Sequence, residues 1–220
     1  MKYQKLIIAA AILIVIGAVG FAVVRMFWVK AIRVPTGAMA NTIVPGDYLI
    51  AYRLFGAVKR GDVVVFQYPN EPSTRYVSRV IGLPGETIRT IGTEVLINDQ
   101  PIPEQRVFVK YPYDFQLGVL EELSTEGSGP YRVFYFKKGE EVMPTVSRDM
   151  KFAVAEPFRI PDNQYFLMSD NRDNSFDSRH KGPVPRELIW GRPNTIYWSS
   201  HADQFHQEKV KWERIGKEIK

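Results

Sequence analysis

The chain has 220 residues, which is enough for one well-buried domain and an accessory segment but not for two domains of ordinary size. It contains no cysteine, so disulfides, thiolate metal sites and cysteine nucleophiles are excluded. The formal net charge of +5 is dispersed except for a denser stretch at Lys209 to Lys220, which favours a mildly basic, membrane-facing protein over a nucleic-acid binder.

The amino-terminal region, residues 1–30, is predicted to be a membrane anchor. Leu6 to Val24 is an uncharged run, with Lys5 before it and Arg25 after it. At about 1.5 Å per residue, such a helix can cross a hydrocarbon layer of roughly 30 Å. A cleaved secretory signal is the alternative, but its apolar part usually has only about 7 to 15 residues. The flanking basic residues do not determine the orientation of the anchor.

Residues 31–220 are predicted to form a mainly β, antiparallel domain. Short runs rich in valine, isoleucine and aromatic residues alternate with turn signals such as Pro45-Gly46 and Pro84-Gly85. The expected strands are residues 47–55, 62–68, 75–83, 94–99, 131–136, 152–156, 164–169 and 195–199. Residues 105–160 are less regular and are predicted to be an inserted β subdomain with its own hairpins.

Four sequence blocks occur in a fixed order along this β region. They are Val34-Pro-Thr-Gly-Ala-Met39 continuing to Gly46-Asp47, Lys59-Arg-Gly-Asp-Val-Val-Val-Phe66, Arg75-Tyr-Val-Ser-Arg-Val-Ile-Gly-Leu-Pro-Gly85, and Ser169-Asp-Asn-Arg-Asp-Asn-Ser-Phe-Asp-Ser-Arg179. Together with the apolar amino terminus, they closely resemble the type I signal peptidase family, the membrane-anchored Ser/Lys endopeptidases of bacteria that remove signal peptides. The resemblance implies that family's β fold, and it covers nearly the whole chain.

The resemblance fails at two catalytic positions. The family's nucleophilic serine corresponds to Ala38, and its general-base lysine corresponds to Ser78. A methyl group cannot attack a carbonyl, and a serine hydroxyl needs a neighbouring base to act as a nucleophile. Losing either member of such a unit typically costs several orders of magnitude in rate. The sequence therefore predicts that this chain does not cut by the Ser/Lys mechanism.

Other matching positions are retained. The resemblance implies an oxyanion role for Thr36 and supporting roles for Ser175, Asp177 and Arg179. The residues that match the family's substrate-binding wall are Ile32, Val34, Met39, Ile43, Tyr76 and Val77, and ordinary core packing is the alternative interpretation of all six. Ile32 and Val34 alternate with Arg33 as a half-buried strand would, so an extended peptide can be expected to add its own strand there.

A relocated active site is the alternative. Thr36 or Ser78 is a candidate nucleophile, and Arg79 or His180 a candidate base, but arginine stays protonated and His180 is expected at the surface. Lys59 and Lys181 are interpreted as solvated turn residues. The acidic and basic residues of the block from Asp170 to Asp173 are interpreted as a network that holds a turn.

The resulting expectation is a membrane-anchored signal peptidase homologue that is catalytically inactive. Its role would be to bind extended, signal-peptide-like segments or to serve as a scaffold subunit of a membrane complex. The alternative is an active peptidase with a non-standard catalytic arrangement. The resemblance implies a single-pass protein of the bacterial inner (plasma) membrane, with its β domain on the periplasmic or extracellular side. No cofactor and no metal are expected, because the three histidines show no ligand spacing.

Overall fold

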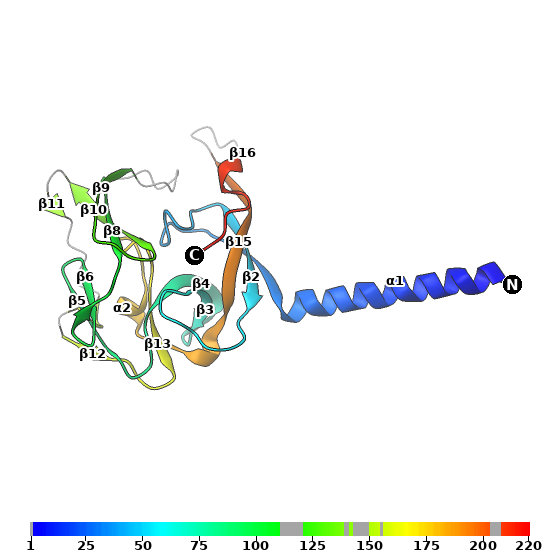
Figure 1. The fold of residues 1–220 in the computed structure, drawn as a ribbon, viewed down its shortest axis with the longest axis horizontal. Helices are drawn as coiled ribbons and strands as arrows, with labels where there is room; N and C mark the ends of the chain where they lie inside the picture. The colour runs from blue at the N-terminus through cyan, green and yellow to red at the C-terminus, as the bar shows by residue number, and fades with distance from the viewer. Residues whose placement is uncertain (1, 111–120, 139–140, 143–149, 155, 203–207) are drawn as a thin grey trace.

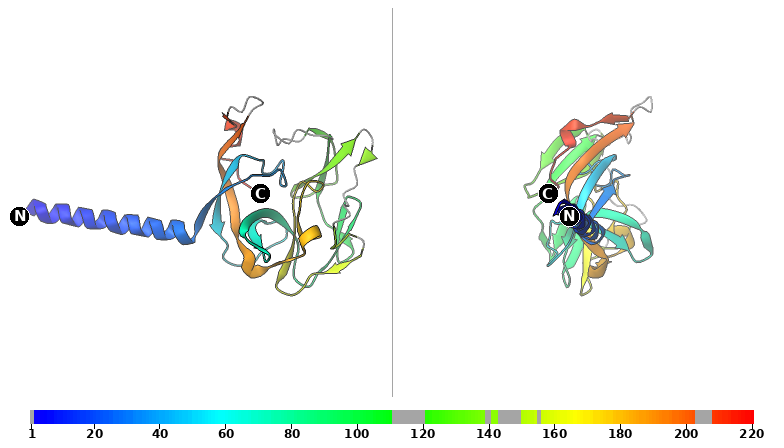
Figure 2. Two further views of the ribbon diagram at one scale, coloured as in Figure 1. Left: turned by 180° about the vertical axis from the view of Figure 1, so that it is seen from behind. Right: turned by 90° about the vertical axis from the view of Figure 1, so that its right-hand side faces the viewer.

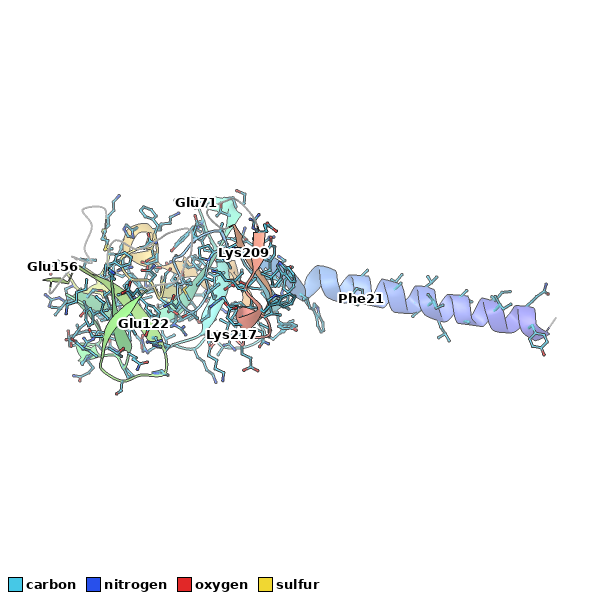
Figure 3. The ribbon with its side chains drawn as sticks, turned by 90° about the horizontal axis from the view of Figure 1, so that it is seen from above. Phe21, Glu71, Glu122, Glu156, Lys209 and Lys217 are labelled. Carbon is cyan, nitrogen blue, oxygen red and sulfur yellow. The ribbon has the colours of Figure 1, made fainter. Side chains whose placement is uncertain are left out.

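A computed structural model describes residues 2–110, 121–138, 141–142, 150–154, 156–202 and 208–220. The chain begins with a long helix, α1 (Lys2–Phe27), which projects away from a body made of β-sheets (Figures 1 and 2). All described side chains of α1 are exposed, and Figure 3 shows Phe21 standing on the helix far from the sheets. Among the described residues, no helix meets the length and apolarity of a membrane span, so the predicted anchor is not confirmed.

The largest sheet contains the two strands that line the cavity described below. Its order is β1-β2-β15-β3-β4-β13-β14, with β16 paired to β15. These strands are β1 (Val29–Arg33), β2 (Asp47–Arg53), β3 (Val63–Tyr68), β4 (Glu71–Gly82), β13 (Gln164–Met168), β14 (Val184–Pro185), β15 (Ile189–Ala202) and β16 (Glu208–Val210). Every pairing in this sheet is antiparallel. Four successive antiparallel pairings lead from β1 to β4, so β1 and β4 run in the same direction.

Two smaller sheets lie beside the large one (Figure 1). One has the order β12-β5-β6-β7, and the other β11-β10-β8-β9. Their strands are β5 (Thr87–Ile91), β6 (Glu94–Ile97), β7 (Gln100–Pro101), β8 (Gln105–Lys110), β9 (Glu122–Glu126), β10 (Arg132–Lys138), β11 (Glu141–Val142) and β12 (Phe158–Arg159). Three short helical turns complete the fold: α2 (Ser178–Lys181), η1 (Arg186–Leu188) and η2 (Trp212–Arg214).

The predicted mainly β, antiparallel fold is confirmed, with one exception. Strand β10 pairs with β8 in parallel, because β9 occupies the other edge of β8 and the chain returns to the free edge in the original direction. The prediction of a subdomain at residues 105–160 stays a prediction. Phe108, Val133 and Tyr135 from that range pack in one buried cluster with Ile81 and Phe166 of the large sheet.

The strand predicted at residues 152–156 is wrong for the described residues 152–154. These residues form bends, and Ala153 adopts a positive φ of 59°. The Phe152 amide donates to the Arg179 carbonyl at 3.1 Å, and its ring contacts that of Phe158, with centroids 5.2 Å apart. The apolar residues of this segment therefore serve packing rather than strand pairing.

Candidate functional site

A cavity of about 680 Å³ lies where β1, β4 and the segments 34–43 and 169–180 meet. A volume of this size is typical of a ligand site. Its lining includes all six predicted wall residues, namely Ile32, Val34, Met39, Ile43, Tyr76 and Val77. It also includes Thr36, Ala38, Ser78 and Ser175, whose roles the family resemblance implies. The structure thus brings these positions together around one space, while their roles stay predictions.

The wall residues reach the cavity because of the strand period. On β1, Ile32 is buried while its neighbours Ala31 and Arg33 are exposed, and Val34 continues the buried face. Ile32, Val34, Met39 and Ile43 belong to one buried cluster, against which Val77 of β4 packs. These side chains therefore pack in the core and also line the cavity.

The segment that carries Ala38 is held by the residues that follow β13. The Asn171 amide donates to the Ala38 carbonyl at 2.9 Å, and Asn171 Nδ2 donates to the Gly37 carbonyl at 3.0 Å. Thr42 Oγ1 donates to Asp170 Oδ2 at 2.6 Å. The block beginning at Ser169 thus positions the turn that, in the resemblance, holds the nucleophile. None of these hydrogen bonds uses the side chain of residue 38, so the conformation of the turn does not depend on it.

The general-base position is occupied by a pair of buried hydroxyls. Ser78 Oγ lies 3.0 Å from Ser169 Oγ, and both residues are buried and line the cavity. Neither hydroxyl is a base near neutral pH. Sequence reasoning assigned no role to Ser169, although it stands directly before Asp170 in the fourth block.

Three supporting residues, Ser175, Asp177 and Arg179, form a connected network. Ser175 Oγ donates to Asp177 Oδ2 at 2.8 Å and accepts from Arg179 Nη2 at 2.8 Å. Arg179 Nε donates to Asp177 Oδ1 at 2.9 Å. Burial raises the pKa of the Asp177 carboxyl, but the charge and hydrogen bonds of Arg179 outweigh it, and the net pKa is lowered. Asp177 is therefore an anion that orients Ser175.

Arg79, a candidate base in the sequence, forms a buried ion pair with Asp170. Its Nε and Nη2 donate to Asp170 Oδ1 and Oδ2 at 2.8 and 2.7 Å, and Nη1 donates to the Gly61 carbonyl at 2.8 Å. Burial lowers the pKa of the guanidinium, but Asp170 raises it by more, so Arg79 stays charged. The charged residues of the block from Asp170 to Asp173 therefore pair with distant residues rather than with one another: Asp170 with Arg79 and Arg172 with Glu104.

Two surface predictions are corrected by the structure. His180 is half-buried, lines the cavity and stacks on Phe176, with ring centroids 4.3 Å apart. Lys181 is half-buried, and its Nζ donates to the Tyr76 hydroxyl at 3.0 Å and pairs with Glu71. Burial lowers the pKa of Lys181, but these hydrogen bonds outweigh it and raise the pKa. Lys181 is thus a poor base. Lys59 is exposed, as predicted.

A metal site is not apparent in the described parts of the chain, where no group of histidine, aspartate and glutamate side chains could hold an ion. The side chains that line the cavity supply hydroxyls, one imidazole, the guanidinium groups of Arg33 and Arg75 and the Asp173 carboxylate beside apolar walls.

Comparison with known proteins identifies the family. The family model described as "Signal peptidase, peptidase S26" matches residues 4–198. The chain belongs to the type I signal peptidase family. Its relatives include a signal peptidase I from Pseudomonas aeruginosa, 32% identical over 88% of this chain and 73% of that protein. Another is a signal peptidase I from Rickettsia typhi, 33% identical over 81% of this chain and 75% of that protein.

A solved structure is also similar to this family member. A signal peptidase I from Enterococcus faecalis V583 is 21% identical, covers 63% of this chain and 98% of its own, and has a TM-score of 0.37. This similarity is too low for a comparison of the two folds.

Some lining residues of this signal peptidase homologue were missed by sequence reasoning. They are Arg33, Thr74, Arg75, Met150, Ser169, Asp173, Asn174 and Phe176. Arg33 and Arg75 stand next to the predicted wall residues Ile32, Val34 and Tyr76 in the sequence, and this adjacency was the available signal.

Proposed function

We propose that this protein binds extended peptide segments in the cavity without cutting them. The observation that supports the proposal most directly is that an apolar-walled cavity is preserved around a methyl group at Ala38 and a hydroxyl at Ser78. The relatives' name, signal peptidase I, indicates the ligand class: signal-peptide-like segments with small side chains. Without a nucleophile and a base, such a segment would be held rather than hydrolysed.

Strand pairing supports this mode of binding. Among the described residues, β1 pairs with β2 alone, and residues 71–77 of β4 pair with β3 alone. Both strands therefore present a free backbone edge beside the cavity. An extended peptide can add to such an edge through main-chain hydrogen bonds while its alternate side chains enter the pocket.

We propose further that α1 attaches the protein to the bacterial inner (plasma) membrane, with the β domain on the periplasmic or extracellular side. The uncharged run from Leu6 to Val24 supports the attachment, and so does the exposure of every described side chain of α1. In that setting, a peptide-binding or scaffold subunit would meet exported chains or other membrane proteins.

The second candidate is an active peptidase with a relocated catalytic pair. One observation favours it: the His180 imidazole lines the same cavity as the hydroxyls of Thr36, Ser78 and Ser175. Histidine is a suitable base near neutral pH. This candidate requires that substitution of His180 abolish a measurable cleavage.

The deciding experiment compares binding and cleavage of one signal-peptide precursor ending in Ala-x-Ala. It uses the unmodified protein, the His180→Ala variant and the Ala38→Ser, Ser78→Lys double variant, all in detergent. We expect binding by the unmodified protein and cleavage by the double variant alone. Cleavage by the unmodified protein that is lost in His180→Ala or Thr36→Ala would establish the second candidate. If the unmodified protein binds no peptide, the scaffold role remains as the non-catalytic function.

A further inference from the structure

Three cations lie close together beside the apolar walls of the cavity: Lys30, Arg53 and Arg75, called the basic rim below. Arg75 lines the cavity itself. Lys30 Nζ lies 4.3 Å from the centre of the Trp190 ring. Burial lowers the pKa of Lys30, and the charges of Arg75 and Arg53 lower it further, so these three side chains lie close enough to repel one another.

The basic rim has no acidic partner in the part of the chain that the structure describes, where no carboxylate lies within ion-pair distance of its members. The other large basic side chains around the site are satisfied, as Arg79 is by Asp170 and Arg179 by Asp177. The one acidic residue of β4, Glu71, pairs with Lys181 instead. A cluster of like charges left uncompensated at a cavity favours an anionic ligand.

The rim is aligned with the apolar walls. Lys30 precedes Ile32 by two residues on β1, and Arg75 precedes Val77 by two residues on β4. Residues two apart on a strand share a face and are separated by roughly 7 Å. Because β1 and β4 run in the same direction, both walls change from basic to apolar at the same end of the cavity.

We propose that the basic rim makes the cavity selective for extended peptides in which an acidic residue stands two positions from the small residue held between Ile32 and Val77. The proposal rests on the peptide-binding function proposed above. A peptide is favoured over a lipid headgroup because the rim continues the walls of the cavity, so one strand-like ligand can contact both.

The test uses full-length protein in a neutral detergent and two fluorescent peptides that carry Ala-x-Ala. The two peptides carry either Glu or Gln two positions before the first alanine. A second pair carries either Glu or Gln two positions after the last alanine. We expect one Glu peptide to bind roughly five- to tenfold more tightly than its Gln partner, as one or two partly screened ion pairs would give. The preference should shrink at 1 M salt, where the screening length is about 3 Å.

The matched variants are the double substitution Lys30→Gln, Arg75→Gln and the control Arg159→Gln. Arg159 is exposed on β12, outside the cavity lining. We expect the double variant to lose the preference for Glu while it still binds the Gln peptide, which also shows that it folds. The control should keep the preference. Equal binding of Glu and Gln peptides by the unmodified protein overturns the inference but not the proposed function, whereas no binding of any peptide overturns both.

Vesicles provide the competing outcome. Binding to phosphatidylcholine vesicles with and without phosphatidylglycerol is measured for the same proteins. If the double variant loses only its binding to phosphatidylglycerol and its peptide preference is unchanged, the rim recognises lipid and the proposal is wrong. Unchanged vesicle binding together with a lost Glu preference supports it.

Discussion

Individual side chains decide what the cavity can do. Ala38 presents a methyl group and Ser78 a hydroxyl to the cavity. Asn171 and Asp170 hold the segment that carries Ala38 through hydrogen bonds to Ala38 and Thr42. Asp177 still orients the Ser175 hydroxyl through a buried network. Under the proposed function, the loss of chemistry is therefore local, and the surrounding hydrogen bonds do not depend on it.

Asp177→Asn is expected to destabilise the fold by about 3 to 5 kcal/mol, because it leaves the buried Arg179 charge without its partner. The lowered folded-state pKa of Asp177 means that its stabilisation is present above the unfolded-state value of about 4 and is lost as pH falls below it. Denaturant unfolding should therefore show stability rising with pH through this window in the unmodified protein. An equally steep rise in the variant would contradict this assignment.

Arg79→Ala is expected to cost about 3 to 5 kcal/mol, because it leaves the Asp170 carboxylate buried and unpaired. The matched control is Arg132→Ala on β10, which removes an arginine pair with Glu122 of similar geometry but higher exposure. The control should cost less than about 1 kcal/mol. Chemical denaturation measures the free energy of unfolding of both variants. Equal losses would show that burial does not determine how much an ion pair contributes to stability.

At the level of elements, the segment between β1 and β2 is a closely fitted loop. The Val34 amide donates to the Asp47 carbonyl at 2.9 Å, and the Gly46 amide donates to the Val34 carbonyl at 3.0 Å. Arg214, far along the chain, donates to both carboxylate oxygens of Asp47. The loop that carries Ala38 is therefore closed by groups from three parts of the sequence.

Gly46→Ala is expected to break this closure. Gly46 has a φ of +87°, and an added Cβ would lie 1.8 Å from the Ser200 carbonyl oxygen, so the strands must separate. We expect a loss of about 2 to 4 kcal/mol from strain and overpacking together. Gly56→Ala is the control, because its φ is +97° and nothing lies within 4 Å of an added Cβ. It should cost only the backbone strain of about 1 to 2 kcal/mol. Thermal unfolding distinguishes the two variants. Equal decreases in Tm would exclude a clash of the added Cβ with the Ser200 carbonyl.

Sequence reasoning succeeded where the signal was local. Runs of valine, isoleucine and aromatic residues between turn signals predicted β2, β3 and β4. It failed where contacts join distant positions. Lys181 was expected in solvent because Glu71, its partner, lies 110 residues earlier in the chain. The segment at Phe152 was predicted to be a strand because its residues are apolar. Apolar residues are buried in strands and in bends alike, so they do not show whether the backbone pairs.

At the level of the whole molecule, α1 stands apart from the β body. Its described side chains are exposed, so folding of the β domain gains little from them. A protein lacking residues 1–27 is therefore expected to unfold within a few degrees of the full chain when both are measured in the same detergent. A large drop in Tm would mean that the helix packs on the domain. Retained α-helical circular dichroism in the shortened protein would conflict with the assignment of most helix to α1.

The junction between α1 and β1 has a mechanical consequence. The helix ends at Phe27 and β1 begins at Val29, so Trp28 alone separates them. The same strand carries Ile32, a wall of the cavity, which makes that wall the first element to receive any force or torque from the helix. Each residue of an α-helix advances about 100° around the helix axis, so lengthening α1 by one residue at its end would swing the cavity mouth to another side of the helix. The direction in which the cavity opens, relative to whatever holds α1, is thus set by the length of a one-residue hinge.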